Sequence, residues 1–325
     1  MERFATKCRS SYKSGAFVTV DEQLVTFRGR CPFKMFIPNK PGKYGIKIWV
    51  LADSHNSYCC NLQVYTGRRG NDREIGQGSR VVLELTEHLS NTGRHITGDN
   101  FFTNLVLVRS LLSRQLTYNG TLRKNKGEIP KEMLPTRQRA TSSSIFGFQQ
   151  DTTLVSYVPK RGKAVILLSS LHHDNECAQD ETKKPQIILD YNQMKSGVDT
   201  LDQVVRCYSV KRKTNRWPFA LFCNLVDMAA YNSFVLFTHL HPEYNRQASH
   251  RRRVFLVELA SQLLPVQAAA VPAAGAVGGG GPMRPGKRRC HLCARGIDRK
   301  VSQQCERCGC KVCNEHCHRV CDNCN

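Results

Sequence analysis

The sequence predicts an α/β protein built on a mixed sheet, followed by a small metal-stabilised module. Three observations lead to this fold class. Residues 1–125 alternate strand and helix signals, as a layered α/β domain does. Residues 142–171 then read as short strands, which predicts a mostly β segment. Nine of the 16 cysteines lie in the last 36 residues, and so short a segment cannot bury a sufficient apolar core without metal.

Seven elements are predicted in the first 125 residues. Their order is three strands, a helix, a strand, a helix and a strand, at residues 16–27, 44–52, 58–65, 79–89, 95–98, 103–112 and 116–122. The strands are rich in β-branched and aromatic residues. The first helix repeats apolar residues at helical spacing. Thr103 or Asn104 can cap the second.

The second half of the chain changes period twice. Residues 124–139 interrupt the pattern with charge and two prolines, short strands follow at 142–171, and another strand is predicted at 186–191. Helices are then predicted at 198–209, 217–240 and 253–264. The run 218–240 is apolar but contains Asn224, Asp227 and Asn232, which a membrane span would resist. We therefore expect a buried helix and no membrane partner.

The net charge indicates the class of partner. Lys and Arg number 48 against 26 Asp and Glu, a formal net charge of +22. Such an excess adds self-repulsion and attracts polyanions, so nucleic acid is the expected partner. The first residues contain no apolar run, so no secretory signal is expected. Cysteines in a chain of this kind are expected to be reduced and to bind metal.

The tail contains four pairs of metal-ligand residues, each with a two-residue gap. They are Cys290 and Cys293, Cys305 and Cys308, Cys313 and His316, and Cys321 and Cys324. Eight ligands predict two tetrahedral, structural Zn²⁺ sites. Spacing alone leaves the pairing open, and we favour an interleaved scheme with the first and third pairs on one ion. A disulfide knot is the alternative, which a reducing compartment disfavours.

Several aspartates are candidate ligands for catalytic metal. Asp21 and Asp99 each follow a strand-like run, and Asp199 and Asp202 lie one helical turn apart. Carboxylates from two strand ends and a nearby helix suit two Mg²⁺ ions, which activate an attacking oxygen and stabilise a leaving oxygen. The residues alone do not select these acids from the other acids in the chain, and each could simply cap a helix or turn.

Basic residues next to the third acid are candidate phosphate contacts. They are Arg206, Lys211, Arg212, Lys213 and Arg216. Phosphate contacts of this kind position a protein on DNA. The alternative is a solvated cluster at a helix end. Further basic clusters at 251–253 and 287–289 could serve nuclear import. His172 and His173 are expected on a surface loop.

Long runs of this sequence resemble the piggyBac transposase family. They are VDEQLVTFRGRCPFKMFIPNKPGKYGIKI, ITGDNFFTNLVLVRSLL, GTLRKNKGEIP, YNQMKSGVDTLDQ and KTNRWPFALF, and the tail is similar to the family's cysteine-rich domain. The resemblance implies an RNase H-like fold with an inserted domain. It also assigns catalytic roles to Asp21, Asp99 and Asp199, and matches Asp202 to the family's additional acid.

The resemblance divides the chain into five parts. Residues 1–125 and 186–265 would form the RNase H-like domain, with a mostly β insertion at 126–185 between the second and third acids. Residues 266–286 are a low-complexity Gly, Ala and Pro segment, which predicts a flexible linker. Residues 287–325 would form the cysteine-rich domain, a double-zinc cross-brace.

The family's activity implies cofactors and partners for this chain. Cut-and-paste transposition at TTAA targets would need Mg²⁺ or Mn²⁺ at the acids and double-stranded DNA as transposon ends and target. Each step is an in-line phosphoryl transfer that one metal pair could serve. A nuclear location and a homodimer are also expected, and a small-molecule substrate is not.

Two other functions remain open at the level of sequence. Family members carry a long N-terminal portion, whereas this chain begins 20 residues before Asp21, so we expect impaired autonomous transposition. A catalytically idle DNA-binding or chromatin-associated derivative is therefore the alternative. A zinc-only adaptor for protein partners is the third reading, but it leaves the first 265 residues unexplained.

Overall fold

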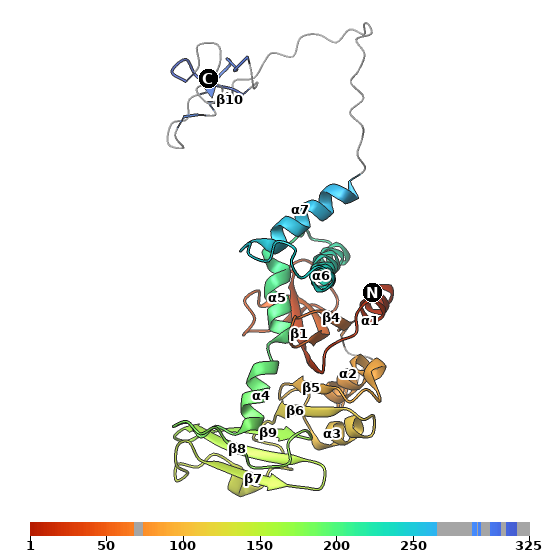
Figure 1. Cartoon of the computed structure of the whole chain (residues 1–325), viewed down its shortest axis with the longest axis vertical. Coiled ribbons are helices and arrows are strands. Elements are labelled where there is room, and N and C mark those ends of the chain that lie inside the picture. Colours follow the sequence, from red (N-terminus) through yellow and green to blue (C-terminus); the bar gives the residue numbers. More distant parts are fainter. Residues whose placement is uncertain (68–73, 265–287, 291, 294–299, 307–309, 317–325) are drawn as a thin grey trace. The chain divides into compact units, whose positions relative to one another are not determined.

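The computed structural model describes residues 1–325 except 68–73, 265–287, 291, 294–299, 307–309 and 317–325. The chain divides into two compact units, residues 1–264 and 265–325. The predicted linker at 266–286 lies outside the described residues. Figure 1 shows the helices and strands of both units.

The first unit is built on one mixed sheet of nine strands among the described residues. Its order is β2-β3-β1-β5-β6-β9-β8-β7, and β4 also pairs with β3. The strands are β1 Phe17–Thr26, β2 Met35–Phe36, β3 Tyr44–Asp53, β4 Cys59–Val64, β5 His95–Gly98, β6 Thr117–Thr121, β7 Ser144–Phe148, β8 Thr153–Lys160 and β9 Lys163–Ser169. The pairs β1–β5 and β5–β6 are parallel, and the other pairs are antiparallel. The predicted mixed sheet is thus confirmed.

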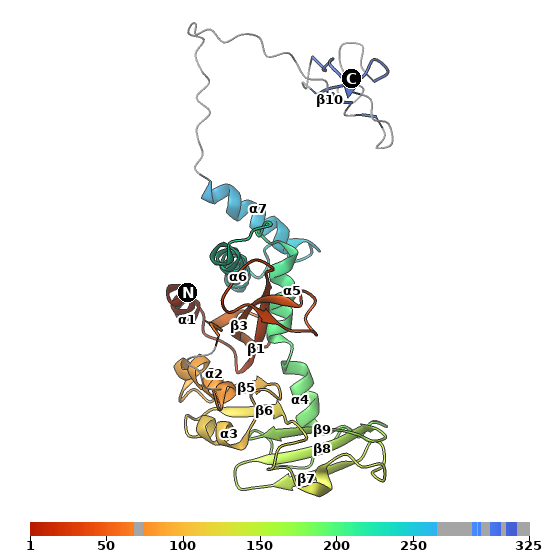
Figure 2. The same ribbon diagram turned by 180° about the vertical axis from the view of Figure 1, so that it is seen from behind.

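Helices cover both faces of this sheet (Figures 1 and 2). They are α1 Glu2–Ser11, α2 Gln77–Leu85, α3 Leu105–Leu112, α4 Gln186–Met194, α5 Gly197–Cys207, α6 Trp217–Leu240 and α7 Arg251–Leu263, with short 3₁₀ turns at Glu87–Leu89 and Lys131–Met133. Asn104 caps α3, since its Oδ1 accepts from the Leu107 N–H at 2.9 Å, as its sequence position predicts.

Two apolar cores explain why helices lie on both faces. Residues at alternate positions of a strand point to opposite faces. Val18 and Val20 of β1 pack with α2 and α3, whereas Val25 packs with α5 and α6. Both faces of β1 and β3 are therefore buried. The acid in the middle of β1, Asp21, must lie under a helix-covered face.

One predicted element differs in the structure, and one helix was not predicted. Residues 186–191, predicted as a strand, begin helix α4. Ile187, Ile188 and Tyr191 pack together against β8 and β9, so the apolar residues follow a helical period that a six-residue window cannot distinguish from a strand. Helix α1 was not predicted. It buries only Ala5 and Cys8, and so weak an apolar stripe gives little periodic signal.

The strands predicted as an inserted β segment continue the main sheet. β9 pairs with β6, with Gly120 opposite Leu168, and β8 and β7 follow in turn. Residues 1–264 form one compact unit. The domain boundaries at 126 and 185 stay predictions, and residues 144–169 are an extension of the sheet in the structure.

Helix α6 is the described helix that is long and apolar enough to cross a membrane by length and composition alone. Its polar residues nevertheless bond inside the unit. Asn224 donates to Gln23 at 2.9 Å, and Asn232 donates to the carbonyl of Cys59 at 3.0 Å. Asp227 accepts from the N–H of Val210 at 2.8 Å. These bonds satisfy buried polar groups, so α6 packs as a core helix, as predicted from its polar residues.

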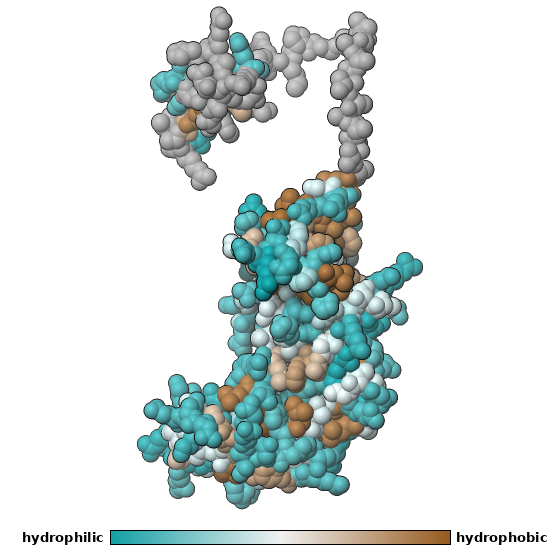
Figure 3. Space-filling model, viewed as in Figure 1, coloured by the Kyte–Doolittle hydropathy of each residue, from teal (hydrophilic) through white to brown (hydrophobic). Residues whose placement is uncertain are grey.

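Apolar side chains remain exposed at the end of α6 and on α7. Figure 3 shows them gathered on the surface over these helices. They include Leu240, Val257, Leu263 and Leu264.

The second unit contains the short antiparallel strand pair β10 Arg288–Arg289 and β11 Lys300–Val301.

Candidate active site and metal centre

The first two acids lie at neighbouring positions, Asp21 on β1 and Asp99 directly after the parallel strand β5. β1 and β5 pair with Val20 opposite Gly98, so the next residues, Asp21 and Asp99, occupy neighbouring positions. Adjacent strands are about 4.8 Å apart, which places the two carboxylates within reach of one cation. β5 ends at Gly98, and the Asp99 carbonyl accepts from Thr103 Oγ1 at 2.8 Å, which begins the turn into α3.

Each of these two carboxylates has one oxygen held by a backbone N–H. Asp21 Oδ1 accepts from Glu22 at 2.7 Å, and Asp99 Oδ1 accepts from Phe101 at 2.9 Å. The second oxygen of each has no hydrogen-bond partner among the residues that the structure describes. Hydrogen-bonded orientation with a free oxygen is what a hard divalent cation requires of a carboxylate ligand.

Burial and neighbouring acids raise the pKa of both carboxyl groups. Burial raises the pKa of Asp21 well above its usual range, and the charges of Glu22 and Asp99 raise it further. Burial likewise raises the pKa of Asp99, with Glu22 adding to it. Like charges crowded in a buried site favour the neutral forms unless a cation compensates them. The electrostatics of this pair therefore suit a positive ligand.

Asp199 approaches the pair from the first turn of α5, which packs against β1. Its side chain is 66% exposed, and Lys40 Nζ lies 3.4 Å from its Oδ1. The charges of Asp99, Asp21 and Asp199 all reach Tyr191, whose pKa is raised by burial and by these acids. In the described part of the chain, however, these acids do not form a group whose ligand atoms all lie within 4.8 Å of one another.

Asp202 is turned into an internal network. Its Oδ1 accepts from Gln23 Nε2 at 3.2 Å, and its Oδ2 contacts Arg206. Gln23 in turn accepts from Asn224 of α6. Burial raises the pKa of Asp202, and the charge of Arg206 opposes that rise. This acid joins β1, α5 and α6, and its predicted catalytic role as the family's additional acid stays a prediction.

The predicted basic residues divide into two groups. Arg206 pairs with Asp202, and Lys211 Nζ contacts the carbonyl of Thr26, so both are engaged within the unit. Arg212, Lys213 and Arg216 are exposed on the loop between α5 and α6. Asp227 holds the start of that loop through Ser209 Oγ at 2.5 Å. The loop thus presents three cations from a fixed base.

The sequence did not predict a second set of interacting polar side chains, which contains a serine, a histidine and an aspartate. His172, expected on a surface loop, is 9% exposed at its side chain. Its Nδ1 lies 2.8 Å from Ser169 Oγ, and its Nε2 lies 2.7 Å from Asp190 Oδ2. The set has the residue types of a hydrolytic triad, but Ser169 is fully buried and cannot meet a substrate. It joins the end of β9 to α4.

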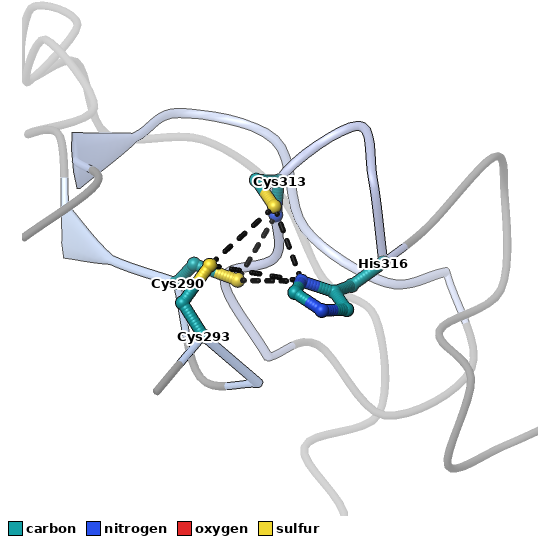
Figure 4. A group of neighbouring side chains, drawn as sticks. All are labelled: Cys290, Cys293, Cys313 and His316. Carbon is teal, nitrogen blue, oxygen red and sulfur yellow. Dashed lines mark hydrogen bonds between the residues drawn. The ribbon is translucent and has the colours of Figure 1, made fainter. Parts of the chain in front are cut away.

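The second unit gathers the first group of predicted zinc ligands. The ligand atoms of Cys290, Cys293, Cys313 and His316 all lie within 4.8 Å of one another (Figure 4). Cys293 and Cys313 Sγ are 3.7 Å apart, and Cys290 Sγ is 3.8 Å from His316 Nδ1. Tetrahedral Zn²⁺ with bonds of about 2.3 Å separates its sulfur ligands by about 3.8 Å, so this donor set fits the ion.

This grouping is the one that the interleaved scheme predicts for the first ion. Of the second group, Cys305 is buried, whereas Cys308, Cys321 and Cys324 lie outside the described residues. The second site stays a prediction.

The family model and the solved structure that match this chain indicate the same class of protein. Residues 1–234 match the family model described as Transposase IS4. A solved piggyBac transposase synaptic complex with hairpin DNA is similar over all of this chain and 72% of that chain, with 36% identity and a TM-score of 0.73. The mixed sheet, the neighbouring acids and these two matches together define the class of protein as a DNA transposase of the piggyBac type.

Curated relatives narrow the class further. PiggyBac transposable element-derived protein 3 of Homo sapiens is 26% identical over 343 aligned positions, covering 98% of this chain and 55% of that protein. PiggyBac transposable element-derived protein 2 of Homo sapiens is 22% identical, covering 68% of this chain and 40% of that protein. The chain belongs to the piggyBac transposase family, and it spans about half the length of these relatives. The expected α/β fold with a mixed sheet is confirmed by the match to the solved piggyBac transposase structure.

The crowded acids predict a stability gain on neutralisation. An acid with a raised folded-state pKa stabilises the fold below its unfolded pKa and loses that contribution as pH rises through the folded pKa. In metal-free buffer, Asp21→Asn should therefore raise the melting temperature at pH 7 by about 2–4 °C, for a gain on the order of 1 kcal/mol. The gain should shrink towards pH 4.

Thermal unfolding with and without Mg²⁺ measures this effect. Asp151→Asn is the matched control, because Asp151 is an exposed acid paired with Arg109 at 3.9 Å. A lower melting temperature for Asp21→Asn than for the parent at pH 7 without metal would show that the pair is not electrostatically strained.

Proposed function

We propose that this chain catalyses metal-dependent cleavage and strand transfer on double-stranded DNA. The observation that carries the proposal is the placement of Asp21 on β1 beside Asp99, which directly follows the adjacent parallel strand β5, each acid having one carboxylate oxygen free. Family membership supports the same chemistry. Cut-and-paste transposition at TTAA targets is the specific reaction proposed from that membership.

Asp21, Asp99 and Asp199 are the residues proposed to hold Mg²⁺ or Mn²⁺. When bound, the metal supplies an activated attacking oxygen and stabilisation of the leaving oxygen of a phosphodiester. Asp21 lies on β1 and Asp99 directly follows β5, and these two strands cannot move independently because a shared backbone ladder joins them. Asp199 comes from a helix and is more exposed, so it is the acid whose position can adjust.

The basic loop is proposed to hold the phosphates that flank the reacting bond. Arg212, Lys213 and Arg216 follow α5, the helix that carries Asp199. Charged side chains so placed fix the register of DNA without reading its sequence. The cysteine-rich unit, with two structural Zn²⁺ ions, is proposed to contribute to recognition of DNA ends. A nuclear location and a homodimer belong to the same proposal.

A catalytically idle DNA-binding derivative is the second candidate. It is favoured by the exposure of Asp199 and by the absence, in the described residues, of a close three-acid group. The named human relatives are transposable element-derived proteins. This candidate retains DNA binding and the zinc unit but lacks cleavage.

Nicking of supercoiled plasmid separates the two candidates. The zinc-loaded chain with Mn²⁺ or Mg²⁺ should convert supercoiled to open-circular DNA, and the conversion should stop when the divalent metal is omitted. Metal must be omitted rather than chelated, because a chelator would also remove zinc. Binding of the same plasmid without nicking, over a titration of both metals, would support the idle derivative.

Salt dependence tests the basic loop. Arg212→Gln, Lys213→Gln and Arg216→Gln combined should weaken DNA binding and lower the slope of log affinity against log salt by about 2–3, one for each lost phosphate contact. The control combines Lys160→Gln, Arg161→Gln and Lys163→Gln, which removes the same charge from the exposed β8–β9 turn. Equal slopes for the two triple variants would mean that only overall charge matters.

A further inference from the structure

Lys40 is a cation placed inside the acidic site by a tight loop. The loop joins β2 to β3, and Lys40 N–H donates to the carbonyl of Ile37 at 3.2 Å, while Lys43 N–H donates to the carbonyl of Lys40 at 3.0 Å. Gly42 approaches β1 so closely that a Cβ there would lie 2.4 Å from Thr26 Oγ1. The loop is thereby fixed against the strand that carries Asp21.

The Lys40 ammonium joins two acid-bearing elements that are distant in sequence. Its Nζ donates to the carbonyl of Glu22 at 3.1 Å and lies 4.0 Å from Glu22 Oε1, both on β1. It also lies 3.4 Å from Asp199 Oδ1 on α5. The Lys40 side chain is only 16% exposed, so solvent screens these contacts less than it screens a surface pair.

Asp199 has no other ion-pair partner in the described part of the chain. Asp21 and Asp99 each have one oxygen on a backbone N–H, whereas Asp199 has one oxygen beside an ammonium; the other oxygen of each acid has no hydrogen-bond partner there. The third acid is thus the one of the three whose carboxylate already lies at ion-pair distance from a cation, and it is also the acid most exposed to water. A divalent ion that takes Asp199 as a ligand must share that carboxylate with the ammonium.

We propose that Lys40 is the internal counter-ion of Asp199 and competes with the divalent metal for that carboxylate. The proposal rests on the proposed function, because it takes the acids as the metal site. In the metal-free chain Lys40 holds α5 against β1 with the third acid in place. A divalent ion that binds Asp199 must either displace the Lys40 ammonium or bind beside it against its repulsion, so the apparent metal affinity is lower than the acids alone would give.

A purely structural role for Lys40 makes a different prediction. If Lys40 only fastened its loop to β1, its loss would lower the melting temperature and leave metal affinity unchanged. If it competes with metal, its loss raises metal affinity. Metal binding without DNA therefore distinguishes the two roles.

The experiment measures Mn²⁺ binding to the zinc-loaded, DNA-free chain by calorimetry and by the loss of the free-ion EPR signal. Lys40→Met should tighten Mn²⁺ binding about two- to five-fold, the equivalent of one partly exposed ion pair. Lys40→Gln serves if Lys40→Met does not fold, and Lys40→Arg, which keeps the charge, should stay near the parent. Lys43→Met is the matched control, an exposed lysine of the same loop with the same change in net charge.

Two further variants identify the site that is measured. Asp21→Asn should remove the tight Mn²⁺ binding. In an Asp199→Asn background, Lys40→Met should no longer tighten what binding remains, because the competed carboxylate is gone. Binding in the parent that does not depend on Asp21 would overturn the proposed function and this proposal with it. Asp21-dependent binding that Lys40→Met leaves unchanged, or tightens no more than Lys43→Met does, would overturn the competition alone.

Discussion

Asp99→Asn is expected to lower metal-dependent DNA nicking by about a thousandfold. Losing one of two strand-borne metal ligands removes several kcal/mol of charge stabilisation, and about 4 kcal/mol corresponds to three powers of ten in rate. The substitution is conservative, since the asparagine oxygen can still accept from the Phe101 N–H that orients Asp99. DNA binding in the absence of metal should therefore persist.

The measurement is the initial rate of plasmid nicking at saturating Mn²⁺, together with DNA affinity by fluorescence anisotropy. Asp151→Asn removes the same charge from an exposed acid and should nick at the parental rate. A nicking rate within tenfold of the parent for Asp99→Asn would place the chemistry elsewhere. Loss of DNA binding in parallel with nicking would instead mean that the turn after β5 had collapsed.

Loss of zinc is expected to unfold the second unit and to leave the first intact. Structural zinc sites contribute roughly 10–16 kcal/mol of apparent binding free energy, which a unit with so small an apolar cluster cannot replace. Beyond the cysteines, that cluster contains Val312, Leu292 and Val301. Cys313→Ser should therefore release one of two zinc ions and make residues 288–325 sensitive to protease, while the main melting transition stays in place.

Zinc content by atomic absorption and limited proteolysis measure this outcome. Cys305→Ser should release the other ion if the ligands interleave, and Cys177→Ser in the first unit should release none. Retention of two zinc ions by Cys313→Ser would exclude the Cys290, Cys293, Cys313 and His316 group as a ligand set. Simultaneous melting of both units on zinc loss would show that they do not fold independently.

Sequence patterns located most of the sheet, for identifiable reasons. The runs that became β1, β3 and β5 carry β-branched residues buried on both faces, and their predicted bounds lie within one residue of those in the structure. Helix α4 was predicted as a strand because its apolar residues lie close together in a short segment. Only their packing against β8 and β9 reveals the helical period. The pairing of β9 with β6 depends on contacts between segments that are distant in sequence, so local sequence patterns cannot predict it.

The acidic site was harder to predict from the residues alone than the sheet was. Resemblance to a family selected Asp21, Asp99 and Asp199 from the other acids, and the parallel register then put the first two side by side. The Lys40 contact joins residues 159 positions apart, and no spacing rule anticipates such a pair. The cysteine pairs were readable because two-residue gaps are local, and the first ligand group followed from them.

The pairing of β9 with β6 also constrains how this protein could be shortened. Excising residues 126–185 would remove the neighbour of β6 and leave backbone groups unpaired along a new edge of the sheet, among them the Tyr118 carbonyl, which accepts from Ser170, and the Leu122 N–H, which donates to Ile166. An exposed sheet edge with unpaired backbone groups can pair with other chains and promotes aggregation. A trimmed version is therefore expected to precipitate unless charged residues are introduced along β6, and evolutionary loss of this segment would demand the same compensation.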